Sequence, residues 1–203
     1  MRILAIETAT EACSVALFED GALLAGEHRI LGRGHAEQLV PMIGALPDHG
    51  QAARILVSLG PGSFTGVRIG IATARALAIA WNAEVLGYPT LALVAAIGRQ
   101  SEPVPVTVCM TGGHGEWLVQ DFSADGLPQA DFASLQPDVA TSRGAHKVIV
   151  GTKASELSTS LSTETVGSTV IPDARNVLTL PTEVLTSGIA PIYARPPDAR
   201  LPS

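Results

Sequence analysis

The sequence predicts an α/β fold made of two related lobes, and three observations carry that prediction. The first hundred residues read as three strands followed by helix, strand and helix. The run Glu102-Pro103-Val104-Pro105 then marks a change of character. Beyond it, strand patterns again come first, as expected for a second lobe of the same class. We therefore expect one lobe over residues 1–101 and a smaller one over residues 102–203.

Three strands in succession open the chain. Arg2–Glu7 and Cys13–Glu19 alternate or are apolar throughout, and Ala22–Ile30 follows. Asp20-Gly21, between the second and third of these segments, is a strong hairpin signal because both residue types tolerate positive φ. The pattern predicts an antiparallel meander.

Helices and a strand follow the meander. Apolar residues recur at helical spacing over His35–Leu46, where Pro41 is expected to kink the helix or loosen one turn. A short apolar strand, Ile55–Leu59, runs into a glycine-rich turn. The turn opens directly into a long helix from about Thr65 to Asn82.

The later elements are shorter and less clearly marked. A strand is expected at Glu84–Gly87, and Thr90 is expected to cap a helix that ends at Ile97. The second half carries three strand patterns, at Val104–Met110, Glu116–Phe122 and Lys147–Val150. The rest is rich in Ser, Thr and Pro, and its patterning is too weak to assign elements.

Composition bounds the class of protein. With 46% hydrophobic residues the chain is globular, yet no apolar run reaches the roughly 18 residues of a membrane span. The net charge is −6 and the 13 basic residues are scattered, which argues against direct nucleic-acid binding. Cys13 and Cys109 stand alone, as buried thiols of a reducing compartment do. The opening residues read as a strand and not as a signal peptide, so a cytoplasmic location is expected.

The glycine-rich turn Gly60–Gly66 allows two interpretations. It lies between a strand and a helix, where free backbone N–H groups often hold phosphates. It lacks the lysine of a phosphate-binding P-loop, however, and Ser63 or Thr65 could cap the helix instead. The bulky Phe64 then suits a contact with another protein, which we favour.

Small side chains recur every four residues along the long helix. They are Gly62, Gly66, Gly70, Ala74 and Ala78. Such a stripe lets a second helix approach closely, and we expect a partner helix to pack against it. Arg68 and Arg75 lie seven residues apart on one face, where they either bind acidic groups of a partner or keep that face solvated.

The first strand ends in Glu7-Thr8-Ala9-Thr10. Strand tips of α/β folds are common ligand positions, and an acid with hydroxyls there can orient a metal-bound phosphate. The alternative, which we favour, is a turn in which the two threonines hold loop amides.

The five histidines are isolated from one another in sequence. His35 has no His or Cys three or four positions away, so we expect a capping or interfacial role and no metal site. The loop Gly112–Glu116 fits either a catalytic loop or a hairpin turn. Pro191–Arg195 resembles a docked tail strand, with Arg195 free for an interface pair.

Three blocks of sequence resemble the TsaB (YeaZ-type) family. They are Met-Arg-Ile-Leu-Ala-Ile-Glu-Thr-Ala-Thr-Glu-Ala-Cys-Ser-Val-Ala-Leu at residues 1–17, Gly-Pro-Gly-Ser-Phe-Thr-Gly-Val-Arg-Ile-Gly-Ile-Ala at residues 60–72, and Pro-Ile-Tyr-Ala-Arg at residues 191–195. The first two are specific as a pair and cover about the first hundred residues. The second half resembles the family only through its Gly-Glu-Trp strand, Ile149-Val150-Gly151 and the tail.

The resemblance implies a two-lobed, actin-like and ribonuclease-H-like fold, with mixed sheets flanked by helices and a reduced second lobe. It also implies a scaffold without catalysis of its own. TsaB-like proteins bind the catalytic subunit TsaD and the ATPase TsaE, which transfer threonylcarbamoyl to N6 of the tRNA adenosine beside the anticodon. The implied partners are a TsaD-like subunit, a TsaE-like ATPase and, for the chain alone, a second copy. Transfer RNA is reached only through the complex, and no cofactor or membrane is expected.

The resemblance assigns the partner interface to the helix near His35 and the helix after Gly-Ser-Phe-Thr-Gly. The contact residues expected on them are His35, Leu39, Met42, Ile43, Ser63, Phe64, Gly66, Val67, Arg68, Gly70, Ile71, Ala74 and Ala78. Tyr193 and Arg195 are expected to dock the tail. Glu7 or Arg195 would support the fold or the site for the ATPase partner.

The sequence departs from the superfamily's nucleotide pattern. Actin-type ATPases carry Asp-x-Gly-Thr at the first strand tip, where this chain has Glu7, Thr8, Ala9 and Thr10. The methyl group of Ala9 hinders close approach of backbone to phosphate. We interpret these four residues as a vestigial phosphate loop.

Two further departures concern catalysis. The His-x-x-x-His metal pair of TsaD-like enzymes is replaced by His35 and Leu39, so no metal is expected. The family's Asp-Ala-Arg-Arg-Gly-Glu-Val-Tyr loop corresponds to residues 111–118, where Thr111 replaces the aspartate. The alternative function is a nucleotide-binding or peptidase-like enzyme of the glycoprotease type, which would bind ATP or metal by itself.

Overall fold

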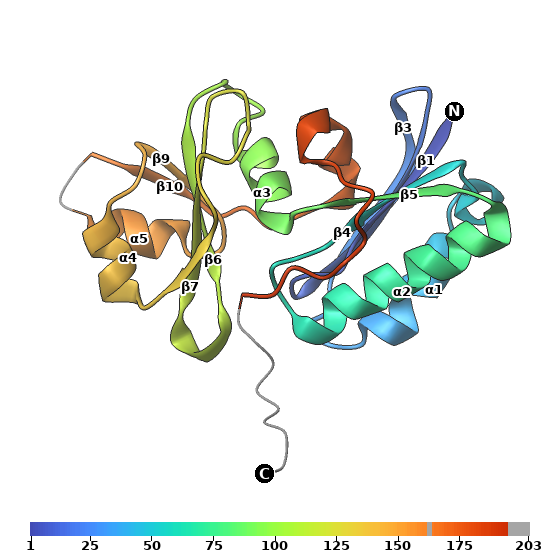
Figure 1. The fold of residues 1–203 in the computed structure, drawn as a ribbon, viewed down its shortest axis with the longest axis horizontal. Coiled ribbons are helices and arrows are strands. Elements are labelled where there is room, and N and C mark those ends of the chain that lie inside the picture. Colours follow the sequence, from blue (N-terminus) through green and yellow to red (C-terminus); the bar gives the residue numbers. More distant parts are fainter. Residues whose placement is uncertain (162–163, 195–203) are drawn as a thin grey trace, which may run out of the picture.

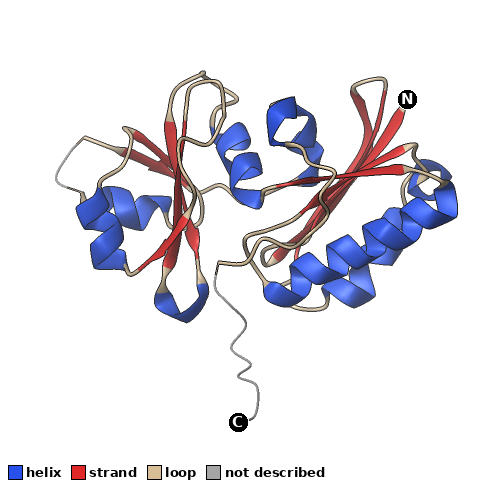
Figure 2. Cartoon of the chain, viewed as in Figure 1, coloured by secondary structure: helices blue, strands red, loops and turns tan. Residues whose placement is uncertain are grey.

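A computed structural model describes residues 1–161 and 164–194. Two five-stranded sheets lie next to each other along the longest axis, and each has helices on its outer face (Figure 1). Figure 2 shows that further helical turns lie between the two sheets. The predicted α/β fold of two related lobes is confirmed.

The first sheet has the strand order β3-β2-β1-β4-β5. Its strands are β1 (Arg2–Glu7), β2 (Ala12–Glu19), β3 (Ala22–Ile30), β4 (Arg54–Ser58) and β5 (Glu84–Tyr88). β1, β2 and β3 pair antiparallel, and β1, β4 and β5 pair parallel. The predicted turn joins β2 and β3, with φ of 50° at Asp20 and 84° at Gly21. All five strands match the predicted segments to within one residue.

The second sheet repeats this topology. Its strands are β6 (Val106–Thr111), β7 (Trp117–Phe122), β8 (Ala133–Leu135), β9 (Val148–Val150) and β10 (Val166–Ser168). The order is β10-β9-β6-β7-β8, so β6 takes the central place that β1 holds in the first sheet. β6, β7 and β8 pair antiparallel, whereas β6, β9 and β10 pair parallel.

Two helices cover the outer face of the first sheet (Figure 1). They are α1 (His35–Gly44) and α2 (Phe64–Trp81). α1 ends two residues earlier than predicted and contains Pro41 within its ten residues. Between them and the sheet lies a core that includes Leu4, Leu39 and Val67.

A third helix, α3 (Thr90–Gly98), follows β5. The prediction that Thr90 caps this helix is wrong, because Pro89 occupies the N-cap position and no side chain caps it. The Thr90 hydroxyl lies instead 2.6 Å from the Ser58 Oγ, in a hydrogen bond within the buried interior. This hydrogen bond ties the last residue of β4 to the first residue of α3.

The outer helices of the second lobe are short and were not predicted. α4 (Pro137–Arg143) and α5 (Ala154–Ser160) have seven residues each, and 3-10 turns form η3 (Ala174–Thr179) and η4 (Thr182–Val184). α4 and α5 cover a small core that includes Ile149 and Leu157. The family resemblance implied a reduced second lobe, and its helices are indeed shorter than the 10 and 18 residues of α1 and α2.

The two lobes exchange their last helical segments. α3 leaves the first sheet and packs against β6, β7 and β9 of the second, while η3 packs against β1, β2 and β3 of the first. Both lie between the sheets in Figure 1. The Ala174 amide donates to the Ser14 Oγ at 2.9 Å, and the Gln100 Nε2 donates to the Asn176 Oδ1 at 2.7 Å. One core cluster therefore contains residues of both lobes, and the division at residues 101 and 102 stays a prediction.

Over the described ranges, no helix combines the length and the apolar character needed to span a bilayer.

Candidate functional site

The tip of β1 and the start of α2 close on each other. The Ser63 amide donates to the Ala9 carbonyl at 2.7 Å, and the Thr8 hydroxyl donates to the Gly66 carbonyl at 2.8 Å. The Ser63 hydroxyl accepts from the Gly66 amide at 3.2 Å, so Ser63 is the N-cap of α2. Of the two caps considered from sequence, Ser63 is confirmed.

Glycine is required where these two segments meet. A Cβ on Gly62 would collide with the Ala9 carbonyl oxygen, and a Cβ on Gly66 with the Thr8 carbonyl oxygen. A Cβ on Gly70 would collide with the Thr8 hydroxyl. These positions are small because the chain's own strand tip lies against them.

The small-residue stripe of α2 therefore does not face a partner, and that prediction is corrected. Gly66, Gly70 and Ala74 are buried against the first sheet, and Ala78 is half-buried. A spacing of four residues places side chains on one face of a helix without saying which way the face points. Here burial of Val67 and Ile71 in the same core turns the stripe inward.

Most predicted contact residues belong to the core of this chain. The buried ones are His35, Leu39, Met42, Ile43, Gly66, Val67, Gly70, Ile71 and Ala74. Ser63, Phe64 and Arg68 are exposed. The buried group cannot contact a partner without opening the lobe, because each side chain is already packed against the sheet or the neighbouring helix.

The outward face of α1 and α2 carries other residues, which the sequence reasoning missed. Val40 on α1 is 59% exposed and Ile79 on α2 is 85% exposed. Ala72 and Ala76 are exposed on α2, on the same side as Arg68. We call Val40, Arg68, Ala72, Ala76 and Ile79 the docking face. The α2 residues of this face could have been predicted from sequence, because they lie on the side of the helix opposite the apolar positions Val67 and Ile71.

His35 is neither the N-cap of α1 nor exposed for contact with a partner, so the predicted capping or interfacial role is corrected. Its Nε2 lies 2.9 Å from the Thr10 carbonyl and 3.2 Å from the Ala12 carbonyl, and only 7% of the residue is exposed. The N-cap of α1 is Gly34, without a side-chain cap. His35 thus ties the start of α1 to the loop after β1.

Glu7 lies fully buried below the strand tip. Its Oε1 accepts from the Ala9 amide at 2.7 Å, while its Oε2 has no hydrogen-bond partner among the described residues. Burial raises the pKa of Glu7 from 4.5 to about 7, against the lowering effect of the hydrogen bond from the Ala9 amide. A carboxyl group in this setting holds its proton near neutral pH.

The strand tip does not fit a metal-bound nucleotide phosphate. The Ser63 and Gly66 amides, which would face a phosphate, already donate within the chain. Glu7 is 0% exposed and its carboxylate does not line the neighbouring cleft, so it cannot reach a metal-bound phosphate there. Among the described residues, no group of three or more His, Cys, Asp or Glu could hold a metal ion.

A cleft of about 430 Å³ opens beside this tip, between the lobes. Thr10 and Ser63 line it from the first lobe, and Thr111 and Gly112 from the second. The Thr111 amide donates to the Thr152 Oγ1 at 2.9 Å, and the two threonine hydroxyls lie 3.0 Å apart. Gly113–Gly115 forms a single 3-10 turn between β6 and β7.

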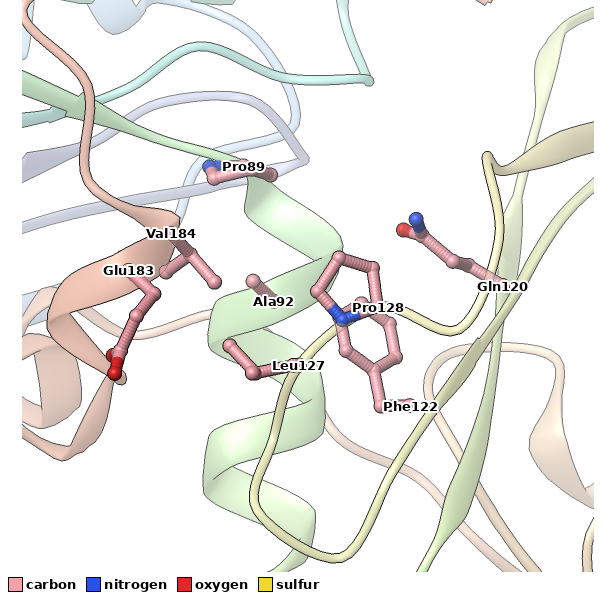
Figure 3. Close-up of a pocket in the computed structure, with 8 residues that line it drawn as sticks. All are labelled: Pro89, Ala92, Gln120, Phe122, Leu127, Pro128, Glu183 and Val184. Atoms are coloured by element: carbon pink, nitrogen blue, oxygen red, sulfur yellow. The ribbon is translucent and has the colours of Figure 1, made fainter.

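A second cavity of about 150 Å³ lies beside α3 (Figure 3). Ala92 and Phe122 line it with other apolar side chains, and Gln120 and Glu183 contribute its polar groups. The Gln120 Nε2 donates to the Ala130 carbonyl at 2.9 Å.

The C-terminal segment runs back along α2. The Ile192 amide donates to the Leu59 carbonyl at 2.7 Å. The Phe64 and Tyr193 rings lie with centroids 5.0 Å apart, and the Arg68 guanidinium carbon stands 3.3 Å from the Phe64 centroid and 5.3 Å from that of Tyr193. The predicted docking residue Tyr193 thus packs on α2, without forming a strand, and Arg195 lies outside the described residues.

Comparison with known proteins gives a consistent result. Residues 29–129 match the sequence profile of TsaD, described as tRNA N6-adenosine threonylcarbamoyltransferase. The chain is 36% identical over 153 residues to the tRNA threonylcarbamoyladenosine biosynthesis protein TsaB of Escherichia coli K12, covering 70% of this chain and 66% of that protein. It is 33% identical over 104 residues to TsaB of Bacillus subtilis, covering 49% and 45%. The matched part thus spans less than two thirds of these curated relatives.

A solved structure extends the likeness to nearly the whole chain. It is a Pseudomonas aeruginosa protein described as uncharacterized and similar to peptidase YeaZ, with a TM-score of 0.80 at 27% identity. The superposition covers 96% of this chain and 99% of that one.

The duplicated strand order with exchanged helices defines an actin-like, ribonuclease-H-like fold of two lobes. Within that class, the sequence and structural matches together show that the chain belongs to the TsaB/YeaZ type.

Proposed function

We propose that this chain acts in tRNA threonylcarbamoyladenosine biosynthesis as a non-catalytic subunit that holds its partners together. The partners are a TsaD-like catalytic subunit and a TsaE-like ATPase, and tRNA is bound through the complex. The names of the relatives support the pathway, and the strand tip that does not fit a nucleotide supports the absence of catalysis. The docking face is the single observation that carries the proposal.

The docking face suits a helical partner. Ala72 and Ala76 present small side chains to the outside, so another helix can approach α2 closely. Ile79 and Val40 offer apolar surface at 85% and 59% exposure. Exposed apolar side chains gathered on one helical layer are typical of a protein contact. Without the TsaD-like subunit, we expect the same face to pair with a second copy.

The closed strand tip has a supporting role in this proposal. We interpret Glu7, Thr8, Ala9 and Thr10 as a vestigial phosphate loop. Two of its residues fix the start of α2, because Ala9 accepts from the Ser63 amide and Thr8 donates to the Gly66 carbonyl. The first turn of α2, with Phe64 and Arg68, is thereby held in place for contact.

The experiment is to measure binding between the purified chain and the TsaD-like subunit of the same organism. Ala76→Trp places a large side chain on the docking face and is expected to weaken binding at least about tenfold, because close helix approach is lost. Val139→Trp is the matched control, since Val139 is 48% exposed on α4 in the other lobe. Equal binding by both variants would contradict the assignment of this face.

The alternative, an enzyme of the glycoprotease type, makes a different prediction. It requires the isolated chain to bind ATP with Mg²⁺, or a metal ion, in stoichiometric amounts. Calorimetry with ATP and metal analysis of the purified chain decide between the two. A stoichiometric signal from either measurement would overturn the non-catalytic proposal.

A further inference from the structure

Two arginines lie in line on the outward face of α2. Arg68 and Arg75 are both exposed and seven residues apart, which places them about 10 Å apart along the helix axis. α2 contains no acidic residue. In the ranges 1–161 and 164–194, neither arginine forms an ion pair with a carboxylate, although six other basic groups do so through a side chain.

The C-terminal segment holds both side chains. Arg68 is stacked on Phe64 and Tyr193, at 3.3 and 5.3 Å from the ring centroids. The Arg75 Nη2 donates to the Ile189 carbonyl. Stacking on aromatic rings leaves the edge of a guanidinium free to donate hydrogen bonds. Among the described residues, Arg68 therefore has no hydrogen-bond acceptor, and Arg75 uses one N–H on the Ile189 carbonyl and keeps the others for a partner.

The surroundings favour a protein carboxylate over a nucleic-acid phosphate. Ala72 lies between the arginines, and Ile79 follows them at 85% exposure. Apolar side chains at such positions suit the packed centre of a protein interface, whereas phosphate binding depends on clustered basic residues. The whole chain carries a net charge of −6, which repels a polyanion.

We propose that the docking face receives a helix of a different chain, and that two carboxylates on that helix, about 10 Å apart, pair with Arg68 and Arg75. Tyr193 is a positioning residue that holds Arg68 for this contact. A second copy of this chain fits less well, because α2 of that copy would bring two further arginines and no acid. This inference rests on the proposed function and names the chemistry of the partner surface.

The test compares charge reversals in the binding measurement with the TsaD-like subunit. Arg68→Glu and Arg75→Glu are each expected to weaken binding about tenfold to a hundredfold at low salt. Lys147→Glu is the matched control, because it makes the same change in net charge on an exposed side chain before β9, in the other lobe. Arg68→Lys keeps the charge without the planar fork and is expected to give an intermediate loss.

A second pair of variants tests the positioning role. Tyr193→Leu removes the ring under Arg68 and is expected to weaken binding several-fold, whereas Tyr193→Phe keeps the ring and the affinity. The salt dependence of binding should fall in Arg68→Glu, because a screened ion pair is gone. A merely structural role of Tyr193 would lower the melting temperature without changing the salt dependence.

Each other result would overturn the inference in a recognisable way. Binding by Arg68→Glu and Arg75→Glu equal to that of Lys147→Glu would show that no carboxylates pair there. Loss of tRNA binding by these variants, with protein binding unchanged, would assign the arginines to phosphate. Dissociation of a dimer of the chain alone, with partner binding unchanged, would assign them to a second copy. If the unaltered chain does not bind the TsaD-like subunit at all, the proposed function fails as well.

Discussion

The two lobes share one sheet topology but use their outer helices differently. In the first lobe α1 and α2 have 10 and 18 residues, whereas their counterparts α4 and α5 have seven each. The short helices do little more than cover the core around Ile149 and Leu157. The long ones bury one face in the sheet and leave a second face outside. The comparison teaches that helix length beyond what the core needs leaves an exposed face, which is the face we propose for a partner.

The strand tips of the two lobes differ in a similar way. In the first lobe the central strand ends in Glu7, which is buried, and the turn before α2 approaches it so closely that glycine is required. In the second lobe the central strand ends in Thr111, which is exposed, and Gly113 beyond it has open space around it. The turn before α5 also approaches the central strand of the second sheet, because a Cβ on Gly151 would collide with the Cys109 carbonyl oxygen. The difference lies in the turn after Thr111, where Gly113 has open space around it.

The largest expected effect tests this difference in packing. Gly66→Ala adds a Cβ that collides with the Thr8 carbonyl, and we expect it to lower the free energy of unfolding by about 3 kcal/mol. Gly113→Ala, which has no atom within 4 Å of the added Cβ, is expected to change it by about 0.5 kcal/mol or less. Urea unfolding of both variants measures the contrast. Similar losses would show that the two tips are packed alike.

The second largest expected effect is a pH dependence of the free energy of unfolding, which we attribute to Glu7 at the strand tip of the first lobe. Glu7 has its pKa raised to about 7 in the folded chain from 4.5, so the native state holds a proton that the unfolded state releases. Its contribution to stability is therefore present below pH 4.5 and is lost as the pH rises to about 7. Glu7→Gln removes this dependence. Between pH 5 and 8 we expect its stability relative to the unaltered chain to rise by about 2 kcal/mol.

Urea unfolding at several pH values checks this prediction. Thr111→Val serves as the control, because the corresponding position of the second lobe carries no titratable group. A constant difference between Glu7→Gln and the unaltered chain across this range would mean that the carboxyl group is not held protonated.

The smallest effect concerns the exchange of segments between the lobes. Ser14→Ala leaves the buried Ala174 amide without its acceptor, and we expect a loss of about 1–2 kcal/mol in the free energy of unfolding. Asn176→Ala removes an exposed hydrogen bond to Gln100 and is expected to cost about 0.5 kcal/mol or less. Amide hydrogen exchange at η3 should rise in Ser14→Ala alone. Equal protection in both variants would argue that η3 is held by apolar packing only.

The first lobe was predictable because its segments are long and periodic. Strands such as Ala22–Ile30, set off by Asp20-Gly21, carry their pattern locally, and so does the long helix, whose cap the sequence narrowed to Ser63 or Thr65. In the second lobe, three-residue strands such as Val166–Ser168 and the seven-residue helices are too short to show a period. Their formation depends on neighbours from distant parts of the chain.

The sequence by itself determined the succession of strands and helices in the first lobe, the antiparallel meander of its first three strands, the turn signals and the presence of a small-residue stripe on α2, because each depends on residues close together in the chain. Only the tertiary structure decided that the stripe faces Thr8 and Ala9, that His35 is a buried tether and that Glu7 is enclosed. The same holds for the arginines, since Tyr193 and Ile189 reach them from more than a hundred residues away. Periodicity fixes which side chains share a face, but only packing between distant segments fixes what that face meets.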